Sequence, residues 1–193
     1  MSYLPQVPPD AKTASLFEEM RSLVGFIPNF YRAQTMRPDI IGAEAQMMET
    51  ILIKEGALTR QHKEYLFLAC SGANLSTYCV TAHCEIVKML GLEGPEPEQI
   101  AIDYTATSLP VPVKALLAFA LKLNEHPTKI DRSDIDALRT YGFNDQQIME
   151  TVVIVGFAKF ANFVGFGLGT VPDFDSSKIV FHENEKVALT SPF

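Results

Sequence analysis

The sequence predicts an all-α fold, arranged as a single compact helical bundle. Apolar residues recur every three to four positions along most of the chain, which is the spacing of helices buried along one side. No segment alternates apolar and polar residues for long, and no hairpin dipeptide stands between β-branched runs. Glycines and prolines punctuate the apolar segments where helices are expected to end and begin.

The N-terminal part is expected to hold an arm and three helices. Prolines among the first ten residues predict an extended arm. Ser15 followed by Glu18 fits a capping box for a helix that ends at Gly25. A short helix is expected to begin near Pro28, and a longer one to occupy residues 38–56.

The middle of the chain predicts a helix pair followed by a weaker segment. Thr59 is expected to begin a helix that ends at Gly72, and a short link leads to the next helix, over about 77–90. Residues 100–109 have only a weak helical pattern. Pro112 opens a strongly patterned helix.

The C-terminal part predicts two more helices, and the second of these is long and apolar. Their caps are expected at two residue pairs, Ser133 with Asp136 and Asn144 with Gln147. Lys159 and Asn162 interrupt the apolar stretch Val152–Gly169, so we expect a buried helix rather than a membrane span.

Length and composition predict one domain over residues 1–193, with an extended arm over 1–12, a helical core over 13–172 and a C-terminal tail over 173–193. A net charge of −7 and the lack of any Lys/Arg run argue against nucleic-acid and membrane partners. The first residues lack the basic start and apolar core of a signal peptide, so we expect a cytoplasmic protein. The cysteine count, which is odd, predicts free thiols.

The residues best suited to chemistry lie between Glu64 and His83. Cys79 and His83 are four residues apart, so they share one face of a helix. Ser76 is a candidate N-cap, which puts Cys79 in the first turn, where the helix dipole favours a thiolate and is expected to lower the thiol pKa. The imidazole can take the thiol proton or pair with the thiolate. If the two helices pack antiparallel, Glu64 can orient the imidazole or relay a proton.

Two other interpretations of these residues stand beside the catalytic one. A Cys/His pair at helical spacing also arises from packing alone, and an isolated glutamate is often solvated or salt-bridged. A zinc site is conceivable because Cys70, Cys79, His83 and Cys84 are close in sequence. Structural zinc sites favour closely spaced cysteine pairs on loops, however, and these four residues fall on different helical faces. We therefore predict no metal and no cofactor.

Together these residues resemble the motif of the alkylhydroperoxidase D / carboxymuconolactone decarboxylase superfamily. Its redox members carry a Glu, eleven residues, and then C-x-x-C-x-x-x-H; Glu64, Cys79 and His83 match that pattern, and the surrounding LTRQHKEYLFLACSGAN is similar as well. The segments GFIPNFYRAQTMRPDII and VPVKALLAFALKLNEH resemble the peroxidase-related branch, and the likeness spans roughly residues 5–172. The resemblance implies a helical bundle that forms a homo-oligomer, as a dimer, trimer or hexamer.

The sequence departs from the family motif at Ser76, which stands where redox members have their first cysteine. Ser76 cannot form the disulfide of the dithiol cycle, and Tyr78, at a position that is often His, can donate a hydrogen bond. Cys84 lies about 140° around the helix from Cys79, too far for a bridge without unwinding. Cys70 could approach Cys79 across an antiparallel pair, although its apolar setting favours a buried structural thiol. The remaining route is a one-cysteine cycle through a sulfenic acid.

The resemblance implies a thiol-dependent, peroxidase-like antioxidant oxidoreductase that takes a small hydroperoxide and a thiol reductant. Cys79 would be the nucleophile, His83 the base and Glu64 the orienting group, with Ser76 and Tyr78 supplying hydrogen bonds. One alternative is a cofactor-free acid–base enzyme of the carboxymuconolactone decarboxylase type, acting on a small carbonyl or lactone substrate. The other is a non-catalytic helical scaffold.

Overall fold

A computed structural model describes residues 2–177, 179 and 181, and no strand lies among them, so the predicted all-α fold is confirmed. The α-helices are α1 (Ala11–Val24), α2 (Asn29–Arg32), α3 (Pro38–Met48), α4 (Arg60–Ala73), α5 (Thr77–Met89), α6 (Pro97–Asp103), α7 (Val111–Glu125), α8 (Arg132–Thr140) and α9 (Asp145–Leu168). Shorter turns are the π-helical η1 (Glu49–Ile53) and the 3₁₀ turns η2 (Tyr104–Ala106) and η3 (Pro127–Lys129).

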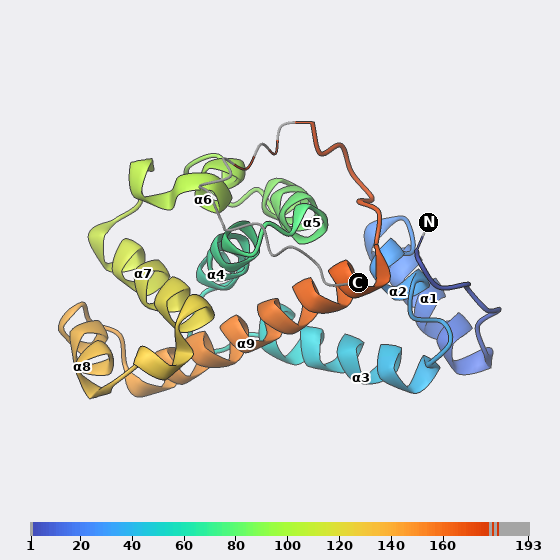
Figure 1. Ribbon diagram of the computed structural model, residues 1–193, viewed down its shortest axis with the longest axis horizontal. Coiled ribbons are helices and arrows are strands. Elements are labelled where there is room, and N and C mark those ends of the chain that lie inside the picture. Colours follow the sequence, from blue (N-terminus) through green and yellow to red (C-terminus); the bar gives the residue numbers. More distant parts are fainter. Residues whose placement is uncertain (1, 178, 180, 182–193) are drawn as a thin grey trace, which may run out of the picture.

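Helix α4 lies at the centre of the bundle, with α5, α6, α7 and α9 around it (Figure 1). Its residues from Lys63 to Gly72 are all buried, because the sequence there is almost entirely apolar or small. Gly72 allows α6 to come close: a Cβ at this position would lie 1.8 Å from the backbone oxygen of Ala101. A side chain at Gly72 would therefore push α4 and α6 apart.

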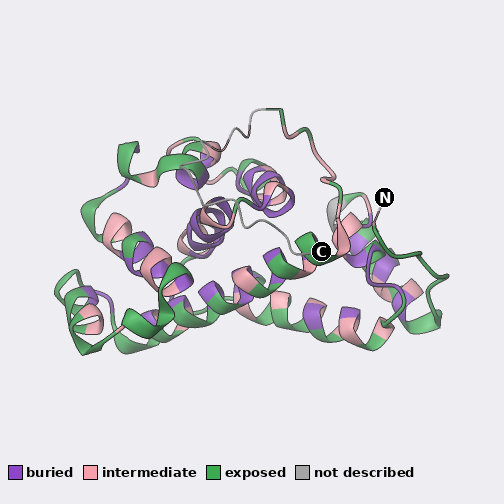
Figure 2. Cartoon of the chain, in the orientation of Figure 1, coloured by how far each residue is buried: buried purple, intermediate pink, exposed green. Residues whose placement is uncertain are grey.

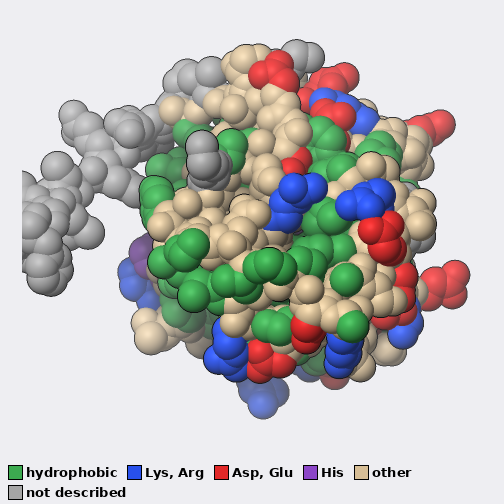
Figure 3. Space-filling view, turned by 90° about the vertical axis from the view of Figure 1, so that its right-hand side faces the viewer, with side chains coloured by type: hydrophobic (Ala, Val, Ile, Leu, Met, Phe, Trp, Pro, Cys, Tyr) green, Lys and Arg blue, Asp and Glu red, His purple; other side chains and the backbone are tan. Residues whose placement is uncertain are grey.

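The N-terminal helices α1, α2 and α3 enclose a second, smaller apolar cluster around Phe17, Tyr31 and Ile41. Phe30 and Met48 pack against both clusters and so join this part to the main core. Apolar side chains also appear on the outer surface at the end of the molecule that carries α1 and α2 (Figure 3). The exposed large apolar residues of the N-terminal segment are Tyr3, Leu4, Val7 and Met36.

Two predicted caps are wrong, each because an aspartate upstream of the expected residue takes the role. Helix α1 begins at Ala11, since the Asp10 carboxylate accepts the backbone N–H of Thr13 at 2.8 Å, and the arm is correspondingly shorter than residues 1–12. Helix α8 begins at Arg132, with a capping box formed by Asp131 and Asp134. The predicted box of Asn144 and Gln147, at the start of α9, is confirmed.

Two helix boundaries also differ from the prediction. The third helix passes from α3 into the π-helical turn η1 and ends before Lys54, short of Gly56. The weak segment 100–109 is helical only to its middle: α6 starts earlier, with Pro97 in its first turn, and the chain is extended again at Thr107. Of the tail predicted over 173–193, residues 173–177, 179 and 181 are described, and the others lie outside the described residues.

Helix α9 is long and apolar enough to cross a membrane by length and composition, with a hydropathy of 1.7 over its most apolar window. In the bundle, 44% of that window is buried, and one side of the helix packs against α4 and α7. Buried and exposed residues are interspersed from one end of the helix to the other (Figure 2). α9 is therefore a core helix of the bundle that also presents an apolar outer face.

Candidate active site

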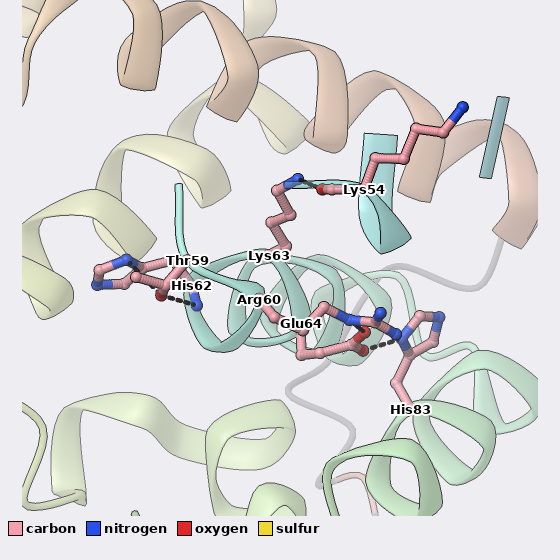
Figure 4. A network of polar contacts seen from close by, with 7 residues as sticks. All are labelled: Lys54, Thr59, Arg60, His62, Lys63, Glu64 and His83. Atoms are coloured by element: carbon pink, nitrogen blue, oxygen red, sulfur yellow. Dashed lines mark hydrogen bonds and ion pairs between the residues drawn. The ribbon is translucent and has the colours of Figure 1, made fainter. Parts of the chain in front are cut away.

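Glu64 and His83 form a buried ion pair across the α4–α5 interface. The Glu64 side chain is fully buried, and its Oε2 lies 2.6 Å from Nδ1 of His83 (Figure 4). Its other oxygen, Oε1, accepts a hydrogen bond of 2.7 Å from Nε of Arg60, one turn earlier on α4. Lys63, next in sequence to Glu64, points away to the carbonyl oxygen of Lys54, at 2.8 Å (Figure 4). The carboxylate is thus balanced by Arg60 and His83.

The surroundings keep Glu64 ionised and fix the His83 ring. Burial by itself raises the pKa of Glu64, but the neighbouring His83 and Arg60 hold that pKa below its ordinary value. Phe67 stacks on the imidazole with ring centroids 3.9 Å apart and planes inclined by 20°. With Nδ1 donating to the carboxylate, Nε2 is left as the ring nitrogen that can accept a proton. In Figure 4 this second nitrogen lies on the side of the ring away from Glu64.

Cys79 occupies the first turn of α5, as its distance from Ser76 predicts, and it is only 4% exposed. Side-chain hydrogen bonds from Ser76, Asn162 and Ser71 reach the sulfur. The expectation of a lowered thiol pKa is wrong: burial raises the pKa of Cys79, and the three hydrogen bonds oppose this rise without overcoming it. The reason is that the N-terminus of α5 is covered by neighbouring helices, and desolvation outweighs the dipole.

Ser76 and Tyr78 flank the thiol with different partners. Ser76 is at the N-cap position of α5, but its hydroxyl caps no backbone N–H. The Tyr78 hydroxyl donates to Oδ2 of Asp173 at 2.7 Å and accepts the backbone N–H of Phe30 at 3.1 Å. Asp173 also accepts the backbone N–H of Asn29, at 3.1 Å from each of its oxygens. This short segment after α9 therefore fixes α2 beside the start of α5.

A set of polar side chains near the thiol was not predicted from the sequence. The sequence showed Asn162 only as a polar interruption of an apolar stretch and singled out neither Ser71 nor Asn74 and Asn124. Asn162 donates to Oγ of Ser71 at 3.0 Å and accepts from Asn74 at 2.8 Å. Asn74 in turn is bonded to Asn124. One signal was present: Ser71 and Asn162 are polar positions inside otherwise apolar helices, where an unbonded polar group would be costly.

The other cysteines have settings unlike that of Cys79. All three are free thiols. Burial raises the pKa of Cys70 to about 12 and that of Cys84 to about 12. The charge of Lys159 opposes the rise at Cys70, and that of Glu98 adds to the rise at Cys84. Among residues 2–177, 179 and 181, no group of three His, Cys, Asp or Glu side chains could hold a metal ion.

The helical bundle resembles several solved structures. A peroxidase-related protein with an alkylhydroperoxidase AhpD core, from Ralstonia eutropha JMP134, matches with 26% identity and a TM-score of 0.84, covering 93% of this chain and 95% of that one. A peroxidase-related protein from Silicibacter sp. TM1040 matches with 26% identity and a TM-score of 0.82, covering 89% and 90%. The debrominase Bmp8, in complex with 2,3,4-tribromopyrrole, has the same fold at 19% identity and a TM-score of 0.72, covering 89% and 93%.

The helical architecture and these likenesses define the class of protein. The chain belongs to the alkylhydroperoxidase D-like superfamily. No protein-family model and no curated protein matches the sequence. Within the superfamily, the chain is similar over nearly its whole length to the two peroxidase-related structures.

Proposed function

We propose that the protein is a thiol-dependent oxidoreductase that reduces small hydroperoxides through Cys79, with His83 and Glu64 moving the proton. The observation that carries this proposal is the buried Glu64–His83 pair, at 2.6 Å, in which His83 lies on the same helix as Cys79, four residues further on. A carboxylate that orients an imidazole is the usual support for a base beside a nucleophilic thiol. The likeness to peroxidase-related proteins favours the same chemistry.

The reaction follows from these groups. Nε2 of His83 takes the thiol proton, and Glu64 stabilises the imidazolium that forms. The thiolate attacks the distal oxygen of the hydroperoxide; an S–O bond forms, the O–O bond breaks, and the alkoxide takes the proton from His83. The sulfur is oxidised by two electrons to a sulfenic acid, and the product is an alcohol. Two molecules of a small thiol then restore Cys79, releasing water and a disulfide.

A deprotonating base matters here because the thiol pKa is raised. Burial keeps Cys79 largely protonated near neutral pH, so the thiolate has to be formed at the moment of attack. Cys79 is four residues before His83 and therefore on its face of α5, whereas Cys84, the next residue after His83, points to another face, and Cys70 lies on α4. The proposal therefore assigns the reactivity to Cys79 and expects Cys70 and Cys84 to be slow.

The test is peroxide consumption with a small thiol as reductant. Cys79→Ser is expected to abolish turnover, while Cys70→Ser and Cys84→Ser, which replace equally buried thiols, are expected to keep it. Undiminished consumption by Cys79→Ser would rule out the proposed nucleophile.

A second candidate, an acid–base enzyme acting on a small carbonyl or lactone, is favoured by one observation. The Glu64–His83 pair is complete without the thiol, because its hydrogen bonds involve only Arg60, Glu64 and His83. This alternative predicts turnover that survives Cys79→Ser and is lost in His83→Ala. The scaffold alternative predicts no turnover by either route and alkylation of Cys79 no faster than that of Cys70 or Cys84.

We also propose that the protein is a homo-oligomer, and the outer face of α9 supports this. Large apolar side chains are exposed there at spacings of mostly three or seven residues, so they fall on one side of the helix, opposite the side that packs in the bundle. They are Met149, Val152, Val153, Phe160, Phe163 and Phe166. Sedimentation is expected to give a dimer or larger species, and Phe163→Glu is expected to shift it towards the monomer; a monomeric parent protein would contradict the proposal.

A further inference from the structure

A hydrogen-bond network runs through the core to Ser71, one of the three side chains that bond to Cys79. Asn124 on α7 donates to Oδ1 of Asn74 at 2.9 Å, and Asn74, which follows α4, donates back to Oδ1 of Asn124 at 3.1 Å. Asn74 also donates to Oδ1 of Asn162 at 2.8 Å. Asn162 on α9 donates to Oγ of Ser71 on α4 at 3.0 Å. Asn124, Asn162 and Ser71 are each at most 1% exposed. The network is therefore buried except at Asn74, which is partly exposed.

The direction of these bonds decides which hydrogens face the sulfur. Because Oδ1 of Asn162 accepts from Asn74, its Nδ2 is turned towards Ser71 and Cys79. Because Oγ of Ser71 accepts from Asn162, the Ser71 hydroxyl hydrogen is left to be donated. Ser76, which caps no backbone N–H, supplies a further hydroxyl at the same sulfur. The geometry thus aims donors at Sγ from two helices and from the turn before α5.

A donor set of this kind favours an anion. A neutral thiol is a weak acceptor and gains little from several donors, whereas a thiolate gains much more from each charge-assisted hydrogen bond. Amides and hydroxyls inside apolar helices are costly to bury unless they are bonded, and donors already polarised by a chain of hydrogen bonds act more strongly. Two members of the network, Ser71 and Asn162, also bond to Cys79, which a network that only held α4, α7 and α9 together would not require.

We infer that Ser71, Ser76 and Asn162 form a donor pocket that stabilises the thiolate of Cys79 at the moment it attacks its substrate. The inference deepens the proposed function and rests on it. In this pocket Ser76 acts as a hydrogen-bond donor at the place where the family motif has its first cysteine. His83 removes the thiol proton, and the pocket holds the negative charge until the S–O bond forms.

The test is the pH dependence of Cys79 alkylation by iodoacetamide, followed by peptide mass mapping in a Cys70→Ser, Cys84→Ser background. Ser76→Ala removes one donor without removing a helix cap, so the variant is expected to fold. Asn162→Asp is close in shape but places a negative charge at the sulfur. In each variant the pH midpoint of alkylation is expected to rise, by about one unit for Asn162→Asp, which is a tenfold loss of thiolate at a fixed pH.

Thr151→Val is the matched control, since it removes another fully buried hydroxyl from α9, one that donates to the backbone carbonyl oxygen of Gln147. An unchanged midpoint in Thr151→Val, with raised midpoints in Ser76→Ala and Asn162→Asp, supports the donor pocket. Equal midpoints in all variants would overturn it and leave the network a structural one, even if the protein consumes peroxide. Raised midpoints in a protein that consumes no peroxide would instead support the pocket and refute the proposed function.

Discussion

The two parts of the candidate site handle charge in opposite ways. The first part consists of Arg60, Glu64 and His83 and is ionic, with a buried carboxylate held between a guanidinium and an imidazole. The second part consists of Cys79 and its donors and is neutral, with a thiol whose burial raises its pKa. Both parts meet along α5. The difference indicates a division of work, in which one part is ready to move a proton and the other to receive a transient negative charge.

The ionic part is expected to give the largest effect on activity. His83→Ala removes the base while leaving Cys79 and its donors in place, and peroxide consumption is expected to fall by about 10²-fold or more. His62→Ala is the matched control, because His62 bonds only to Thr59 at the start of α4. A loss of less than about threefold in His83→Ala would show that the thiol reacts without this base.

Removing the Glu64 charge is expected to damage stability as well as activity. Glu64→Gln leaves Arg60 and His83 without their carboxylate in a buried setting, which should cost about 3 kcal/mol of unfolding free energy. Urea denaturation measures the loss. Glu93→Gln replaces an exposed carboxylate and serves as the control, and equal midpoints for the two variants would contradict the importance of the pair.

The two parts are also expected to change the stability of the protein in opposite pH ranges. Glu64 has a lowered pKa in the folded protein, so its contribution to stability is complete above its ordinary value of 4.5 and is lost as the pH falls through the folded value. Cys79 has a raised pKa, so its contribution is complete below its ordinary value of 9.0 and is lost as the pH rises. Thermal unfolding of Glu64→Gln and Cys79→Ser against pH checks both directions. An acid-side loss that is unchanged in Glu64→Gln would contradict the first.

The smallest effect is expected at Asp173, in the segment after α9 that bonds to Tyr78 near the thiol. Asp173→Asn weakens the bonds to the Tyr78 hydroxyl and to the N-terminus of α2, at a cost of about 1 kcal/mol. Alkylation of Cys79 is expected to become a few times faster at constant pH, with an unchanged pH midpoint. Asp175→Asn, two residues on, is the control. Slower alkylation in Asp173→Asn would contradict a covering role for the segment.

Periodicity and punctuation were enough to predict the fold and most helices, because burial on one side of a helix leaves a local pattern in the sequence. The approach of Glu64 to His83 could also be anticipated, since both lie on adjacent helices joined by a short link. The sign of the Cys79 pKa shift could not, because it depends on how completely other helices cover the start of α5. The caps at Asp10 and Asp131 were missed because serine-based pairs downstream fitted the same pattern.

The donor pocket could not be predicted from the sequence, for a related reason. Asn74, Asn124 and Asn162 are far apart in the sequence, and nothing local indicates that α4, α7 and α9 bring them together. The contact of Asn162 with Ser71 and Cys79 is a property of the packing.

The measurement that tests the central claim most directly is the site of first oxidation. Reduced protein would be treated with about one equivalent of an organic hydroperoxide, then with a sulfenic-acid trap, and mapped by peptide mass spectrometry. We expect fast trapping at Cys79 alone, slowed strongly in His83→Ala. Slow labelling spread over Cys70, Cys79 and Cys84, and indifferent to His83, would contradict the account.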